Sequence, residues 1–126
     1  MSLADYVRNS PTPDSAEKMI QEAEAIANSL ASRKFTMTQL RGIFGHVRRL
    51  DAMGQVKRDW TKFRLLEPRI HYRLERHIEQ NKDSRDAVIS FKKEILSALK
   101  EVGTDDGKFN RFVEAFETIV AYMPRK

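Results

Sequence analysis

The sequence predicts an all-α protein, a compact bundle of five to six helices. Apolar residues recur three and four positions apart along most of the 126-residue chain, which is the period of an amphipathic helix. Runs of alternating polar and apolar residues, typical of strands, are missing. Glycine and proline gather at few places, so few breaks are expected. A chain of this length is expected to form one domain.

The first thirteen residues are expected to form a flexible lead-in to a single helical domain over residues 14–123. They end in Ser-Pro-Thr-Pro, which disfavours a continuous helix. Asp14 or Ser15 can cap the first helix, which is expected to extend to about Ser32. The apolar face of this helix consists of Met19, Ala23, Ile26, Ala27 and Leu30.

A capping box predicts where the second helix begins. Thr36 is followed three residues later by Gln39, so each side chain can bond to the backbone N–H of the other residue. Apolar residues then follow at nearly ideal helical spacing. They are Leu40, Ile43, Phe44, Val47 and Leu50.

Pro68 divides the next helical stretch in two. The first part is expected to begin near Gln55 and to bury Val56, Trp60, Phe63 and Leu66. Proline lacks an N–H and suits the start of a helix, so Pro68 is expected to be the first residue of a new segment. The core positions of that segment are Ile70, Leu74 and Ile78.

Two further helices complete the expected bundle. Residues 81–84 form a break, after which Asp83 or Ser84 caps a helix that Gly103 ends. Residues 104–107 are expected to form a loop before the last helix. The core positions of these two helices are Val88, Phe91, Ile95 and Leu99, then Phe109, Phe112, Val113, Phe116, Ile119 and Val120.

The net charge of +5 comes from the middle of the chain. Residues 41–85 carry twelve lysines and arginines against six aspartates and glutamates, whereas the flanking parts are nearly neutral. All three histidines lie in the same stretch. This concentration indicates a surface for a polyanion, with a solvated helix face that happens to be basic as the alternative.

Helical periodicity places many of these basic residues on outward faces. Arginine suits phosphate because its planar fork donates two parallel hydrogen bonds. The tyrosine among these arginines can stack on an unpaired base or cover the edge of the core. Contacts of this kind hold the nucleic-acid backbone and carry no sequence information. The candidate RNA-binding residues are Arg41, Arg48, Arg49, Arg58, Lys62, Arg69, Tyr72, Arg73 and Arg76.

Two small residues, Gly45 and Ala52, lie on the same side of the second predicted helix as its arginines. Small residues there let a backbone approach closely. They serve either an external partner or a tight helix crossing, and the sequence favours neither interpretation.

The sequence offers no convincing catalytic or metal site. Glu67, His71 and Glu75 recur at four-residue intervals, but three successive helical turns are too far apart to close a metal shell. Ion pairs with basic residues of the same region explain the carboxylates more simply. The chain has no cysteine and no glycine-rich phosphate loop. We therefore expect a non-enzymatic protein without metal or cofactor.

No apolar run is long enough to cross a bilayer, and no signal-peptide core follows the N-terminus. These two observations predict a protein without a membrane partner. We expect it to be cytoplasmic.

TMTQLR at residues 36–41, the segment at residues 66–76 and the segment at residues 112–122 resemble, in this order, parts of the small helical subunit of type III-A CRISPR effector (Csm) complexes. TMTQLR at residues 36–41 resembles the family's helix start, T-x-[ST]-Q-L-R. Residues 66–76 resemble its L-x-P-[KR]-[LI]-x-Y-x-x-x-R segment. Residues 112–122 resemble its aromatic closing helix, which typically reads F-E-A-[IL]-V-A-Y. The central segment departs from the family pattern, because bulky residues stand where the family has small ones and a glycine.

The resemblance implies a non-catalytic subunit of an RNA-guided interference complex in antiviral defence. Family members bind target RNA or the guide–target duplex through basic surface residues, and sequence selection is left to guide pairing. The implied partners are target RNA and guide RNA, other type III effector subunits, and neighbouring copies of the same chain. Two alternatives stay open here: the small subunit of type III-B complexes, and a helical protein-interaction adaptor with an acidic partner.

Overall fold

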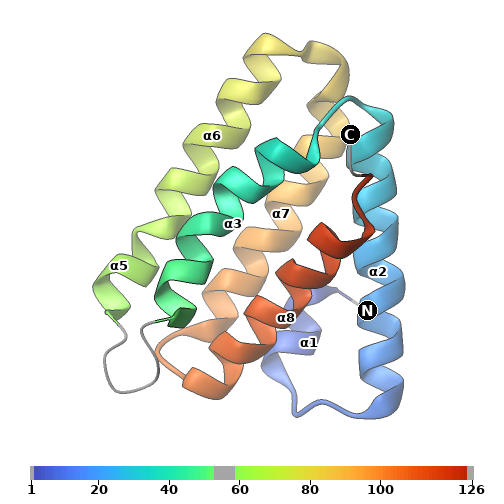
Figure 1. Cartoon of the computed structure of the whole chain (residues 1–126). Coiled ribbons are helices and arrows are strands. Elements are labelled where there is room, and N and C mark those ends of the chain that lie inside the picture. Colours follow the sequence, from blue (N-terminus) through green and yellow to red (C-terminus); the bar gives the residue numbers. More distant parts are fainter. Residues whose placement is uncertain (1, 53–58, 125–126) are drawn as a thin grey trace.

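The computed structural model describes residues 2–52 and 59–124, and within these two ranges it contains helices and no strand (Figure 1). The predicted all-α bundle is confirmed. Gln55, Val56 and Arg58, which the sequence placed on its third helix, lie outside the described residues. The elements are α1 (Leu3–Arg8), α2 (Pro13–Ser32), α3 (Met37–Ala52), α5 (Trp60–Arg64), α6 (Leu66–Gln80), the 3-10 turn η1 (Lys82–Ser84), α7 (Arg85–Val102) and α8 (Asp106–Tyr122).

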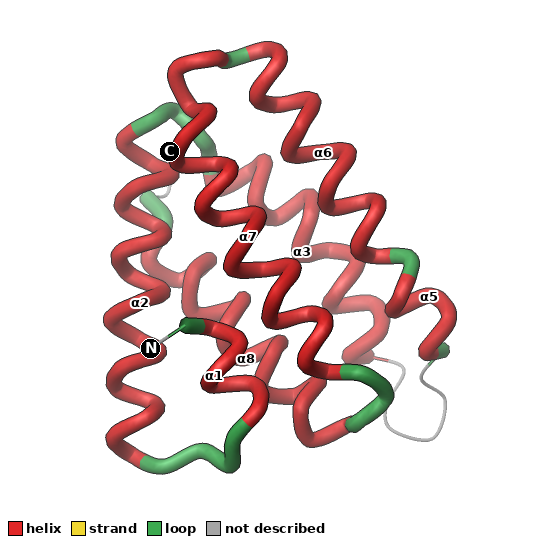
Figure 2. Tube along the Cα trace, turned by 180° about the vertical axis from the view of Figure 1, so that it is seen from behind, coloured by secondary structure: helices red, strands yellow, loops and turns green. Residues whose placement is uncertain are grey.

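The helices form two layers that are closed at one edge by α2. One layer contains α3 and α8, and the other contains α6 and α7, with α1 lying against α7 (Figures 1 and 2). α2 packs against both α8 and α7. At the opposite edge, α3 and α6 make fewer contacts with each other than with their neighbours in their own layers. Six arginines lie on these two helices: Arg41, Arg48 and Arg49 on α3, and Arg69, Arg73 and Arg76 on α6.

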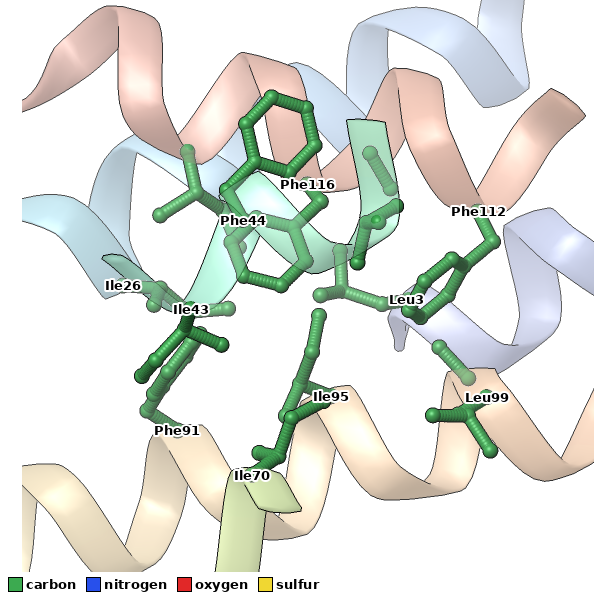
Figure 3. Packing of buried hydrophobic residues seen from close by; sticks show 14 of the residues in the cluster. Leu3, Ile26, Ile43, Phe44, Ile70, Phe91, Ile95, Leu99, Phe112 and Phe116 are labelled. Atoms are coloured by element: carbon green, nitrogen blue, oxygen red, sulfur yellow. The ribbon is translucent and has the colours of Figure 1, made fainter. Parts of the chain in front are cut away.

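Most of the apolar positions that periodicity predicts belong to the core (Figure 3). Every predicted core residue of α2, α3 and α7 is buried. Phe116 joins three helices, because its ring stacks on Phe44 at 4.9 Å and meets Phe91 edge-on at 6.1 Å. Trp60, Ile78 and Val120 are only partly buried and pack against the outside of this core.

The N-terminal residues differ from the expectation. Residues 3–8 form α1, and the side chains of Leu3 and Val7 are fully buried. The prediction of a flexible lead-in is therefore wrong for these residues. A six-residue helix is too short to show a periodic pattern, and it is stabilised by packing on α7 and α8 instead of by its own propensity.

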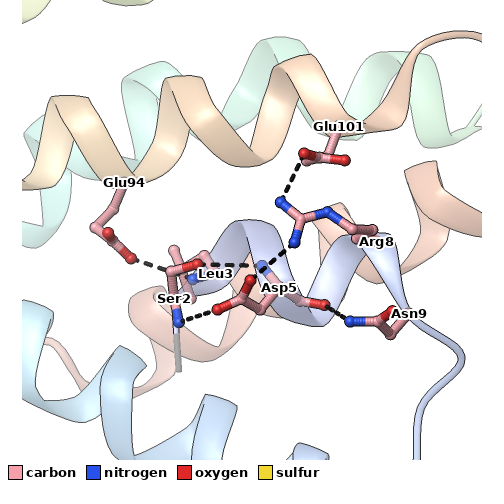
Figure 4. A network of polar contacts seen from close by, with 7 residues as sticks. All are labelled: Ser2, Leu3, Asp5, Arg8, Asn9, Glu94 and Glu101. Atoms are coloured by element: carbon pink, nitrogen blue, oxygen red, sulfur yellow. Dashed lines mark hydrogen bonds and ion pairs between the residues drawn. The ribbon is translucent and has the colours of Figure 1, made fainter.

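Polar contacts fix both ends of α1 (Figure 4). Ser2 and Asp5 form a capping box, in which the Ser2 hydroxyl accepts a hydrogen bond from the Asp5 N–H at 3.2 Å. At the other end, Arg8 donates to Glu101 of α7 at 2.8 Å. The hydrogen bond from Arg8 lowers the pKa of the Glu101 carboxyl.

Several predicted helix ends are confirmed. The Thr36–Gln39 capping box is present, since the Thr36 N–H donates to the Gln39 side chain at 2.8 Å and the Thr36 hydroxyl accepts from the Gln39 N–H. Gly103 ends α7 with a φ of 57°, a conformation that glycine adopts at little cost. Ser84 is the N-cap residue of α7, although its side chain makes no capping bond.

Three helix starts differ from the prediction. α2 begins at Pro13, and Thr12 is its N-cap. Pro68 is the third residue of α6 instead of the first. Proline is tolerated there because the backbone N–H groups of the first turn have no partner within the helix. α8 begins inside the predicted loop, because the Asp105 side chain accepts from the Lys108 N–H at 2.9 Å and caps the helix there.

His77 is buried where α6 meets the start of α3. The Gln39 side-chain oxygen accepts from the Thr36 N–H, so the Gln39 amide nitrogen faces the His77 Nδ1 at 3.0 Å. That nitrogen donates, so Nδ1 must accept and the His77 ring is neutral. The ring also meets Phe35 edge-on at 4.8 Å. Burial lowers the pKa of His77 below the usual value of 6.5.

The free energy of unfolding is expected to fall as the pH drops through about 6.5. The pKa of His77 is higher in the unfolded chain than in the folded chain, so the unfolded chain binds the proton first as the pH falls. Acidification therefore favours unfolding in the pH range between the folded and the unfolded pKa. His77→Gln keeps an acceptor but does not titrate, and it should reduce the difference between urea unfolding at about pH 8 and at about pH 5.5. His71→Gln, at an exposed site on the same helix, is the matched control. An unchanged pH dependence in His77→Gln would contradict this role.

Candidate nucleic-acid interface

A groove lies between α3 and α6, at the edge where these two helices make few contacts. One hollow of this groove has a volume of about 480 Å³ and includes His46, Arg69, Tyr72, Arg73 and Arg76 in its lining. No aspartate or glutamate of the described residues lines it. The hollow is therefore a positively charged and open surface.

A second hollow of about 350 Å³ continues the groove toward α5. Arg49 and Lys62 contribute to it, and it shares His46 and Arg69 with the first hollow. Its described lining is also free of acidic side chains. We call the two hollows together the basic groove, whose basic side chains are His46, Arg49, Lys62, Arg69, Arg73 and Arg76.

The structure brings together six of the nine predicted RNA-binding residues. They line the basic groove and are all exposed: Arg49, Lys62, Arg69, Tyr72, Arg73 and Arg76. Arg41 and Arg48 are also exposed on α3 but line neither hollow. Arg58 lies outside the described residues.

Sequence reasoning missed His46 as a groove residue. All three histidines lie in the basic stretch, but the sequence alone assigns no role to this one. The useful signal was its spacing, because His46 precedes Arg49 by three residues and so lies on a neighbouring part of the α3 surface.

Gly42 allows an arginine of α6 to lie against α3. A Cβ atom at this position would be 2.9 Å from the Arg73 Nη1. Gly45 is different, because a Cβ atom there would meet nothing within 4 Å among the described residues. The interpretation of Gly45 as a tight helix crossing is therefore wrong, whereas approach by an external backbone stays a prediction.

Tyr72 stands on the rim of the basic groove with 60% of its surface exposed. The Arg76 Nη1 donates to its hydroxyl at 3.0 Å, which fixes the two side chains relative to each other. A side chain this exposed does not cover the edge of the core. Its ring face is open to a stacking partner.

Two of the three residues considered as metal ligands, His71 and Glu75, contact a lysine. Lys92 of α7 pairs with Glu75 at 3.4 Å and also lies 3.3 Å from the His71 Nδ1. The partner of Glu75 thus comes from α7, not from the basic residues of its own region. The described residues contain no group of three or more His, Cys, Asp or Glu side chains placed to hold a metal ion.

A sequence model of the family described as Csm2 Type III-A matches residues 13–124, which is most of the chain. The chain belongs to the Csm2 family. Csm2 is the small subunit of type III-A CRISPR effector complexes, so the protein associates with other Csm subunits. The resemblance seen in the three segments is confirmed, and the type III-B alternative is replaced by type III-A. No curated protein and no solved structure matches the chain.

The Csm2 match begins at Pro13, the first residue of α2, so α1 precedes the matched range. The basic groove lies wholly within the matched range. None of the described helices is both long enough and apolar enough to span a membrane.

Proposed function

We propose that this Csm2 subunit is a non-catalytic scaffold that holds target RNA, or the guide–target duplex, by its phosphate backbone. The observation that carries the proposal is the basic groove, in which six basic side chains converge without a carboxylate among the described lining residues. The proposed setting is the cytoplasm, in antiviral defence by the type III-A complex.

The electrostatics of the groove support an anionic ligand. Among the described residues, no carboxylate pairs with Arg69, Arg73 or Arg76. Like charges held close together repel one another, and this repulsion is relieved when an anion enters. A chain of phosphates matches a row of guanidinium groups better than a single anion does.

The groove is expected to bind without reading bases. Its basic groups are suited to phosphate oxygens, which are the same in every sequence. Tyr72 adds a ring that stacks on any base, because every base has a π-face. Sequence selection would then belong to pairing between guide RNA and target RNA, as in other guided effectors.

Neighbouring copies of the chain and other type III effector subunits are the proposed protein partners. Copies that are held on one guide RNA need only modest contacts with each other, because the shared scaffold raises their effective concentration. We therefore expect the free protein to self-associate only weakly.

The proposal predicts equal affinity for two single-stranded RNAs of the same length and unrelated sequence, within about twofold. Fluorescence anisotropy with labelled oligonucleotides measures this directly. A preference of about tenfold for one sequence would contradict backbone binding. If polyglutamate bound while neither RNA did, the result would favour the adaptor with an acidic partner.

A further inference from the structure

His46 lies where the two hollows of the basic groove meet. It lines both hollows, and its Nδ1 atom lies 3.5 Å from the Arg69 Nη1. Arg49 faces the same space from α3, Lys62 from α5 and Arg73 from α6. No aspartate or glutamate of the described residues lines either hollow.

The contact with Arg69 defines the protonation state of His46 in the empty groove. A guanidinium group only donates hydrogen bonds, so the Nδ1 atom must accept and the proton resides on Nε2. Burial lowers the pKa of His46, and Arg69, Arg73 and Arg49 lower it further. Both effects favour the neutral ring in the empty groove.

We infer that His46, Arg69 and Arg73 form a site for one phosphodiester group, and that His46 takes up a proton from solvent when this group binds. The inference rests on the proposed function, since it names the point at which the RNA backbone is held. A phosphate between these side chains places a negative charge beside His46 and favours its charged form. The protonated Nδ1 and the Arg69 Nη1 can then both donate to the same phosphate oxygens.

Gly42 lies on α3 one helical turn before His46 and supports the same site. Because it has no side chain, the Arg73 guanidinium can lie against α3, close to the face that carries His46. The site is thus built from both helices of the groove. A single helix would supply only part of it.

Proton uptake makes RNA affinity depend on pH. Protonated His46 binds phosphate better than the neutral ring, so the His46 pKa is higher in the RNA complex than in the free protein. RNA affinity therefore rises as the pH falls from the bound pKa to the free pKa. If the phosphate raises the pKa by about one unit, the affinity gain is about tenfold.

The test compares binding of oligouridylate RNA at about pH 8 and about pH 5.5 for the wild type, His46→Gln and His71→Gln. The wild type and His71→Gln should bind more tightly at the lower pH, by up to about tenfold, whereas His46→Gln should change by less than about twofold. The His71 control has the same chemistry but lies outside both hollows. Thermal unfolding of each variant checks that the fold is intact.

NMR titration of the His46 ring gives a second readout. The His46 pKa should rise when oligouridylate or dimethyl phosphate is added. Dimethyl phosphate keeps a single negative charge between about pH 5.5 and about pH 8, so its own titration does not contribute to the shift. An equal pH effect in the wild type and His46→Gln, or a His46 pKa unmoved by either probe, would overturn the inference and leave the proposed function standing. If dimethyl phosphate moves the pKa but no RNA binds at any pH, the phosphate site stands and RNA binding fails.

Discussion

Replacing Phe116 by alanine should lower the free energy of unfolding by about 3–5 kcal/mol. The Phe116 side chain is fully buried, stacks on Phe44 at 4.9 Å and meets Phe91 and Phe112 edge-on at 6.1 Å and 6.2 Å. Its removal would leave a cavity between α3, α7 and α8 and would remove these ring contacts. Chemical denaturation followed by circular dichroism gives the value.

Tyr122→Ala on the same helix is the matched control. Tyr122 keeps 42% of its surface exposed, so its replacement should cost less than about 1 kcal/mol. If Phe116→Ala also cost less than about 1 kcal/mol, the packing of α8 described above would be wrong.

The double substitution Arg69→Ala/Arg73→Ala should weaken RNA binding roughly a hundredfold. Both side chains line the basic groove from α6, and the loss of each charged hydrogen bond to phosphate is worth about 1.5 kcal/mol. Neither side chain is buried, so the fold should be retained. Binding isotherms at constant salt, with RNAs of unrelated sequence, should show the same loss for every sequence.

Lys93→Ala/Lys100→Ala removes two positive charges from exposed positions on α7 and is the control for net charge. Neither lysine lines the basic groove. An equal loss in both double variants would show that overall charge, and not the groove, determines binding. A small loss in the lysine variant alone agrees with the proposal.

Much of the fold could be predicted because helix period and burial agree along the chain. The predicted core positions of α2, α3 and α7 are all buried, and the Thr36–Gln39 capping box forms as expected. What could not be predicted depends on tertiary contacts. α1 exists because Leu3 and Val7 pack on helices about ninety residues away in the chain, which local patterns cannot reveal.

The candidate site was predicted only as separate helix faces. Periodicity placed Arg48 and Arg49 together, but one helical step separates them, and only Arg49 lines the basic groove. The groove itself arises from the pairing of α3 with α6, which sequence spacing does not specify. For the same reason His46 was missed, since its role comes from its proximity to Arg69 on another helix.

The salt dependence of RNA binding tests the central claim most directly. With about four to six phosphates contacted, log affinity for single-stranded RNA should fall against log salt concentration with a slope of roughly −3 to −4. Arg69→Ala/Arg73→Ala should make this slope shallower by about 1.4 units, because each phosphate contact to a single strand accounts for about 0.7. A slope near zero in the wild type, or an unchanged slope in the double variant, would contradict phosphate binding in the basic groove.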